Sequence, residues 1–156
     1  MTTMTTYDFR DGKGPVLAHR HTNGGGWVAD SAYVSVSAYV DPNAAVYGRA
    51  RVQESAKVLG NAKVYGDAYI SDNAKVLGNA QVYGNAQISG DAKVYGNARI
   101  YDNAEVYDNA EVYGNAKVYD NAEVYGNAEV YGEAEAFGDA WVSGSDEVYG
   151  DTLVYW

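Results

Sequence analysis

The side chains best suited to chemistry lie in the N-terminal segment, residues 1–26. The two histidines, His19 and His21, lie near the cations Arg10, Lys13 and Arg20. Guanidinium forks and imidazole N–H groups donate hydrogen bonds to anions such as carboxylates and phosphates. The cluster therefore predicts a site for an anionic small molecule, and the alternative is a solvated segment with ordinary hydrogen bonds.

The residue types present in the chain argue against most catalytic chemistry. The chain contains no cysteine, and its two histidines are too few for a three-histidine metal centre. Neither a phosphate-loop sequence nor a Gly-x-Ser-x-Gly nucleophile sequence is present. We therefore expect a protein that is not an enzyme, with no catalytic residues, no metal site and no cofactor.

A six-residue repeat fills the rest of the chain and must position these side chains. From Val28 to Val154 an aliphatic residue recurs at every sixth position, and each of them is Val or Ile except Ala136. The position two places before it is alanine in every hexad from Ala32 to Ala140. Alternate residues of a strand point to opposite faces, so Ala and Val point inward and the residue between them points outward.

The remaining residues of each hexad predict a corner. Gly-Asn, Asp-Asn or Gly-Asp follows the strand in most hexads, and these residues tolerate the left-handed backbone angles that a corner needs. A strand this short buries its apolar face only by stacking on other strands. The outward residues repeat every 18 positions, as Leu59 and Leu77 or Ser71 and Ser89 show. Three hexads per coil and about seven coils follow, in an all-β parallel β-helix roughly 35 Å long.

The unit Val-x-Gly-Asn-Ala-x, continued over residues 28–154, resembles the hexapeptide-repeat family. Members of that family form left-handed parallel β-helices and usually trimers, so the resemblance implies a left-handed helix and a homotrimer. Residues 11–27, DGKGPVLAHRHTNGGGW, resemble the entry segment of hexapeptide transferases of unassigned activity from phages and prophages. We expect residues 1–26 to form an N-terminal cap, with Leu17 and Trp27 covering the first coil, and residues 27–156 to form the β-helix.

One of the three outer faces differs from the other two. It carries an aromatic residue in each coil and several cations beside them, among them Lys63, Arg99 and Lys117. The second face has serine at the corresponding position in several coils, so folding alone does not require tyrosine there. We interpret the aromatic and basic face as a subunit interface or a ligand surface, with fold stabilisation by stacked tyrosines as the alternative. The ligand-binding candidates are Arg10, His19, Arg20, His21, Tyr65, Tyr83, Arg99 and Tyr101.

Charge and hydropathy restrict the partners. Residues 1–100 hold 10 Lys and Arg against 8 Asp and Glu, and residues 101–156 hold 1 against 13, so the net charge changes from +2 to −12 along the chain. The acidic half should repel nucleic acid, and no apolar run is long enough for a membrane helix. We therefore expect the protein to bind neither nucleic acid nor membranes. We expect it to be cytoplasmic, in the host cell if the protein is phage-encoded.

Three functions are compatible with the sequence. The leading interpretation is a non-catalytic oligomeric β-helix, used as a scaffold or binding protein and derived from a phage. The first alternative is a phage sponge that sequesters an anionic nucleotide-like signal in grooves between subunits. The second alternative is a hexapeptide acyltransferase, although the chain lacks the interrupting loop and histidine base that the family's acyltransferases usually have.

Overall fold

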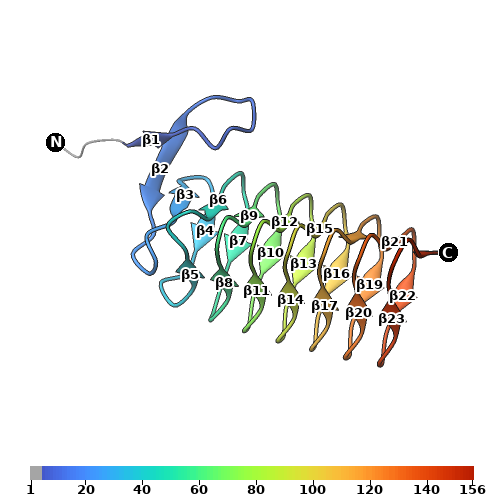
Figure 1. The fold of residues 1–156 in the computed structure, drawn as a ribbon. Coiled ribbons are helices and arrows are strands. Elements are labelled where there is room, and N and C mark those ends of the chain that lie inside the picture. Colours follow the sequence, from blue (N-terminus) through green and yellow to red (C-terminus); the bar gives the residue numbers. More distant parts are fainter. Residues whose placement is uncertain (1–4) are drawn as a thin grey trace.

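The hexads form a rod of short parallel strands in a computed structural model that describes residues 5–156 (Figure 1). The predicted all-β parallel solenoid is confirmed, and residues 5–156 contain no α-helix. Each strand of the rod pairs in parallel with the corresponding strand of the next coil, as in Gln81 with Arg99 and Val82 with Ile100. The hand of the helix stays a prediction.

The strands line up in three sheets, one along each side of the rod. The first sheet contains β3 (Trp27–Ala29), β6 (Ala45–Val46), β9 (Lys63–Val64), β12 (Gln81–Val82), β15 (Arg99–Ile100), β18 (Lys117–Val118), β21 (Glu135–Phe137) and β24 (Leu153–Tyr155). The second sheet contains β4 (Tyr33–Val34), β7 (Arg51–Val52), β10 (Tyr69–Ile70), β13 (Gln87–Ile88), β16 (Glu105–Val106), β19 (Glu123–Val124) and β22 (Trp141–Val142). The third sheet contains β5 (Tyr39–Val40), β8 (Lys57–Val58), β11 (Lys75–Val76), β14 (Lys93–Val94), β17 (Glu111–Val112), β20 (Glu129–Val130) and β23 (Glu147–Val148).

The core consists of the inward Val, Ile and Ala side chains, as predicted. From Val40 to Ala140 every one of them is buried, with at most 1% of its surface exposed. The pattern ends at the last coil, where Asp146 replaces alanine and is exposed. Trp141, Leu153 and Trp156 are exposed there as well. The apolar interior is therefore continuous through the rod and weakens at its C-terminal end.

The corners use the left-handed backbone that the sequence predicts. Gly66, for example, has φ +71°, and a Cβ atom there would lie 2.9 Å from the backbone nitrogen of Gly84, one coil further on. Asp72 adopts φ +58° at a corresponding corner, where its carboxylate accepts the N–H of Gly90 at 2.9 Å. Asp108 and Asp120 accept the corresponding N–H of the next coil as well, so at these three corners the aspartate that replaces glycine links two coils.

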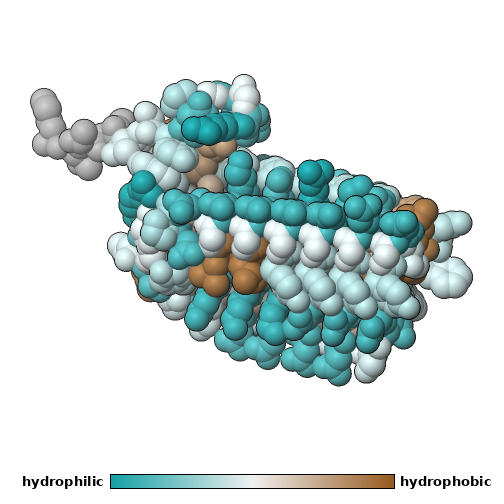
Figure 2. Space-filling view, viewed as in Figure 1, coloured by the Kyte–Doolittle hydropathy of each residue, from teal (hydrophilic) through white to brown (hydrophobic). Residues whose placement is uncertain are grey.

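Asparagine side chains stack beside these corners. The Nδ2 group of each residue donates to the Oδ1 atom of the corresponding asparagine in the next coil, at 3.1–3.3 Å along the series Asn61, Asn79, Asn97 and Asn115. Such amide ladders satisfy donors and acceptors between identical neighbouring strands. Figure 2 shows hydrophilic residues in a continuous row along a corner of the rod.

An antiparallel hairpin extends the first sheet at its N-terminal end by two strands. Strand β1 (Thr6–Tyr7) pairs with β2 (Val16–Arg20), and β2 pairs antiparallel with β3. Phe9 and Ala18 are buried in this cap, whereas Leu17 is 44% exposed. The expectation that Leu17 covers the first coil is therefore wrong, because β2 directs Ala18 rather than Leu17 towards the rod.

The segment after β2 closes the first coil of the third sheet. A Cβ atom on Gly26 would overlap the Val40 side chain, so only glycine fits this approach. The Gly26 N–H donates to the Val40 carbonyl at 2.9 Å, and Asn23 Nδ2 donates to the Ala38 carbonyl at 3.0 Å. These contacts explain the glycine-rich sequence between β2 and β3 as a structural cap.

Candidate functional site

Aromatic rings form a stack along the outer face of the first sheet. Neighbouring rings lie 4.8–5.1 Å apart and within 18° of parallel, in the series Tyr47, Tyr65, Tyr83, Tyr101, Tyr119, Phe137 and Tyr155. Phe9 of the hairpin stacks on Tyr47 at 4.8 Å and continues the series at its N-terminal end. The predicted tyrosine ladder is therefore confirmed, and the cap contributes a ring to it.

In the shorter ladders on the other two sheets, several tyrosine hydroxyl groups are bonded within the chain. On the third sheet Tyr95 donates to Glu111 at 2.9 Å and Tyr113 donates to Glu129 at 2.8 Å. On the second sheet Tyr107 donates to Glu123 at 2.9 Å. In each case the acceptor lies on the next strand of the same sheet, at a sequence separation of 16 from the tyrosine. Folding accounts for these ladders, because each phenol links two coils.

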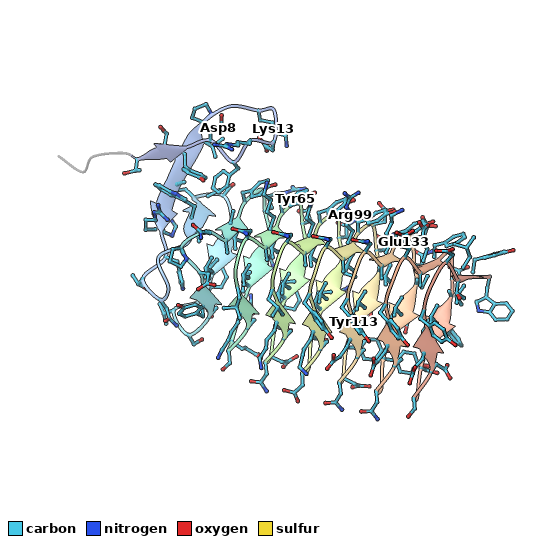
Figure 3. All side chains as sticks on the ribbon, viewed as in Figure 1. Asp8, Lys13, Tyr65, Arg99, Tyr113 and Glu133 are labelled. Atoms are coloured by element: carbon cyan, nitrogen blue, oxygen red, sulfur yellow. The ribbon has the colours of Figure 1, made fainter. Side chains whose placement is uncertain are left out.

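The first sheet places cations at several of the equivalent acceptor positions. Arg99 follows Tyr83, and Lys117 follows Tyr101, at the same separation, and neither cation can accept a hydrogen bond. Within residues 5–156 neither of these two hydroxyls has a side-chain hydrogen bond, unlike Tyr65, which donates to Gln81 at 3.2 Å. Figure 3 shows Tyr65 and Arg99 on the side of the rod that the hairpin overhangs, while Tyr113 lies on another side. We call Tyr83, Arg99 and Tyr101 the open strip.

The charges along this face are only partly compensated. Lys117 forms an ion pair with Glu135 at 2.6 Å, and the hydrogen bond from Lys117 lowers the pKa of the Glu135 carboxyl group. Arg99 is exposed and has no ion pair among residues 5–156. Burial raises the pKa of Tyr83, whereas the positive charge of Arg99 acts in the opposite direction. The open strip therefore presents neutral phenols beside a free guanidinium group.

The tyrosine ladder predicts an alkaline limit to stability. Burial raises the pKa of Tyr65 and Tyr101 to about 12, while phenols of the unfolded chain ionise near 10. The folded state therefore binds more protons between these values, so the free energy of unfolding is undiminished below pH 10 and decreases as the pH rises from 10 towards 12. Phenolate absorbance, titrated in buffer and in concentrated urea, should show the later ionisation only in the folded protein. Equal midpoints under both conditions would contradict the shift.

The ligand-binding candidates of the cap, Arg10, His19, Arg20 and His21, do not form one cluster. Arg20 Nη1 donates to the carbonyls of Gly25 at 2.8 Å and Pro42 at 3.0 Å, and its guanidinium carbon lies 4.2 Å from the centre of the Trp27 ring. His19 Nδ1 contacts Asp30 at 2.8 Å. His21 is buried, with Nε2 3.0 Å from the Ala38 carbonyl. Both histidines therefore have structural partners within the chain.

Arg10 and Arg20 line the same cleft, which lies between the hairpin and the first coils. The cleft has a volume of about 450 Å³, and Lys63 of β9 contributes a third cation. Its remaining lining residues are Tyr7, Asp8, Phe9, Trp27, Pro42, Asn43, Ala45 and Asn61. Neither histidine is among them. Sequence reasoning assigned Lys63 to the aromatic and basic face and missed its position in the cleft, because only the folded hairpin brings residues 7–10 to residues 61–63.

A second groove follows the corner between the first and second sheets. It has a volume of about 550 Å³ and contains the carboxylates of Asp102, Asp120 and Asp139. Asp120 accepts the Gly138 N–H at 3.2 Å, and Asp139 accepts a hydrogen bond from Asn121 at 2.9 Å. Two of these carboxylates thus link coils. No group of three or more His, Cys, Asp or Glu side chains in residues 5–156 is arranged to hold a metal ion.

Comparison with known proteins gives no matching family model, no matching curated protein and no matching solved structure. The part of the chain that the structure describes has no helix of the length and apolarity needed to cross a membrane.

Proposed function

We propose that this chain is a non-catalytic β-helical scaffold or binding protein that assembles into a homotrimer through the outer face of its first sheet. The observation that carries the proposal is the open strip, where two stacked phenols and a guanidinium group lack side-chain partners within residues 5–156. Tyrosine and arginine are enriched at the centres of protein interfaces. Tyr95, Tyr107 and Tyr113 on the other sheets, and Tyr119 further along the first sheet, already bind glutamates of their own chain.

Charge complementarity supports the second sheet of a neighbouring copy as the opposite surface. Glu105 and Glu123 lie directly beside each other there, in a pair of adjacent parallel strands, so two like charges are stacked. Glu105 follows Arg99 in the same coil, and Glu123 follows Lys117 in the next coil. Rotation about an axis parallel to the rod keeps equal coils at equal heights, so cations of one copy meet these glutamates of another.

The third sheet is a poorer partner for the open strip. In the coil of Arg99 it offers Glu111, whose charge is already compensated by Lys93 at 2.6 Å, whereas neither Glu105 nor Glu123 forms an ion pair within residues 5–156. The resemblance to hexapeptide-repeat proteins, which are usually trimers, supports three copies rather than two. The resemblance of residues 11–27 to the entry segment of phage and prophage proteins supports a phage origin and, with it, the host cytoplasm as the location.

The double variant Tyr83→Glu with Tyr101→Glu should yield folded monomers. Each new carboxylate lies 16 residues before a cation of the next coil, Arg99 or Lys117. This is the separation of the tyrosine–glutamate hydrogen bonds on the other sheets, so each new glutamate can pair with a cation of its own chain. At a subunit contact, however, the carboxylates would face Glu105 and Glu123 of the neighbouring copy and repel them. Light scattering of the purified variant should therefore report one third of the parent's mass.

The matched control is Leu59→Glu with Leu77→Glu. These half-buried residues occupy the same position within their hexads on the third sheet, and the next strands of that sheet place Lys75 and Lys93 after them. The control should keep the parent's mass. A Tyr83→Glu and Tyr101→Glu protein that keeps the parent's mass, or a parent that is itself monomeric, would contradict the proposed interface.

A further inference from the structure

The cleft beneath the hairpin concentrates positive charge in an acidic protein. Arg10, Arg20 and Lys63 line it together with a single carboxylate, that of Asp8. The cleft thus carries a formal charge of +2, since three cations face one anion, whereas the whole chain carries −10. Within residues 5–156 none of the three cations forms an ion pair. The local charge therefore favours an anionic ligand.

Contacts within the chain fix the Arg20 guanidinium group and leave some of its N–H donors unused. Its Nη1 group binds the carbonyls of Gly25 and Pro42, and Trp27 lies against the guanidinium group. Tyr7 stacks on Trp27 at 4.3 Å, which fixes the ring in turn. Two of the five guanidinium N–H groups are used, so Nε and Nη2 keep three donors in the fork geometry that matches phosphate oxygens.

Arg10 and Lys63 line the cleft from two different parts of the structure, the hairpin and strand β9. The Arg10 backbone has φ +58°, and its N–H donates to the Asp8 carboxylate at 2.8 Å, so a tight turn sets the start of this side chain. Lys63 lies on β9 of the rod, next to the asparagine ladder. A ligand bound by both cations would therefore join the hairpin to the first sheet.

We propose that this cleft binds the phosphate group of a small phosphomonoester through Arg10, Arg20 and Lys63. The volume of about 450 Å³ lies in the range of small-molecule pockets, which leaves room for an organic part beside the phosphate. The amides of Asn43 and Asn61 line the same cleft and can donate to or accept from hydroxyl groups. All these residues belong to one chain, so the site does not depend on the proposed trimer.

Calorimetric titration with inorganic phosphate and with ribose 5-phosphate tests the site. We expect saturable binding of both, and at least a tenfold rise in Kd in the variant Arg10→Gln with Lys63→Gln. Lys13→Gln with Lys57→Gln is the matched control, because it removes the same charge from exposed positions outside the cleft. Tighter binding of ribose 5-phosphate would show that the organic part contributes, and equal affinities would assign recognition to the phosphate group alone.

A second measurement on the parent protein does not require the variant to fold. Ribose 5-phosphate should shift the indole N–H resonance of Trp27 and leave those of Trp141 and Trp156 unchanged, because only Trp27 lines the cleft. Absence of saturable binding, equal weakening in the control variant, or equal shifts at all three indoles would overturn the proposal. Light scattering of the same samples reports the oligomer independently, so failure of this site and failure of the proposed interface are distinguishable.

Discussion

Replacing Val94 by Asp should disrupt the rod at its centre and lower the free energy of unfolding by about 3–5 kcal/mol. Val94 is fully buried and pairs in register with Val76 on one side and Val112 on the other. A carboxylate there would lie in an interior of Val, Ile and Ala that offers it no ion-pair partner. Because each coil contacts only its neighbours, the damage should divide the stack into two parts. Urea unfolding followed by circular dichroism measures the loss.

Two controls separate burial from charge and from size. Val94→Ile should cost little, because Ile70, Ile88 and Ile100 occupy the same inward position in other hexads. Lys57→Asp introduces aspartate at an exposed position of the same sheet, next to Lys75, and should change the stability by less than about 0.5 kcal/mol. A Val94→Asp protein as stable as the parent would show that the inward assignment of this position is wrong.

Deleting the single residue Asn97 should unfold most of the chain that follows it. A shift of one position moves each inward side chain of a strand to the outer face. Downstream of the deletion the valines would leave the core, and outward residues such as Lys117 would turn towards it. We expect partial loss of the β-sheet signal by circular dichroism, because β1–β14 precede the deletion, and rapid proteolysis after β14.

Deleting one whole coil, residues 97–114, is the matched control and should leave a folded, shorter rod. The deletion joins Gly96 to Asn115, which restores the Gly-Asn-Ala corner, and Lys117 takes the position of Arg99 on the first sheet. The short protein should melt cooperatively, with slightly lower stability because one coil is lost. Equal behaviour of the two deletions would contradict the coil register.

The architecture was predictable because each hexad repeats the same pattern of residues. Ala-x-Val defined the core and Gly-Asn defined the corners, and the 18-residue period of residues such as Leu59 and Leu77 indicated which strands stack. A comparable signal existed for the tyrosine–glutamate hydrogen bonds, since a glutamate follows Tyr95, Tyr107 and Tyr113 at a constant separation of 16. The 18-residue spacing indicates which strands stack but not these bonds, which follow from the 16-residue spacing.

The N-terminal cap could not be predicted in the same way. Its conformation depends on single contacts, such as Phe9 on Tyr47 and Arg20 with the carbonyls of Gly25 and Pro42. No repeated sequence pattern predicts these contacts. Proximity in the sequence suggested that His19 and His21 belong with Arg10 and Arg20, but strand β2 gives the histidines other partners. Lys63, which is distant in the sequence, lies in the cleft instead.

The bonding between coils also constrains how a gene of this kind can change length. Duplication of a single hexad would preserve the interior, because every hexad presents the same Ala and Val. It would nevertheless move every later strand from its own sheet to the next sheet of the rod. Tyrosines near the insertion would then no longer lie beside their glutamate acceptors. Duplication of three consecutive hexads keeps both the interior and the outer ladders. We therefore expect natural length variants of this protein to differ by whole coils.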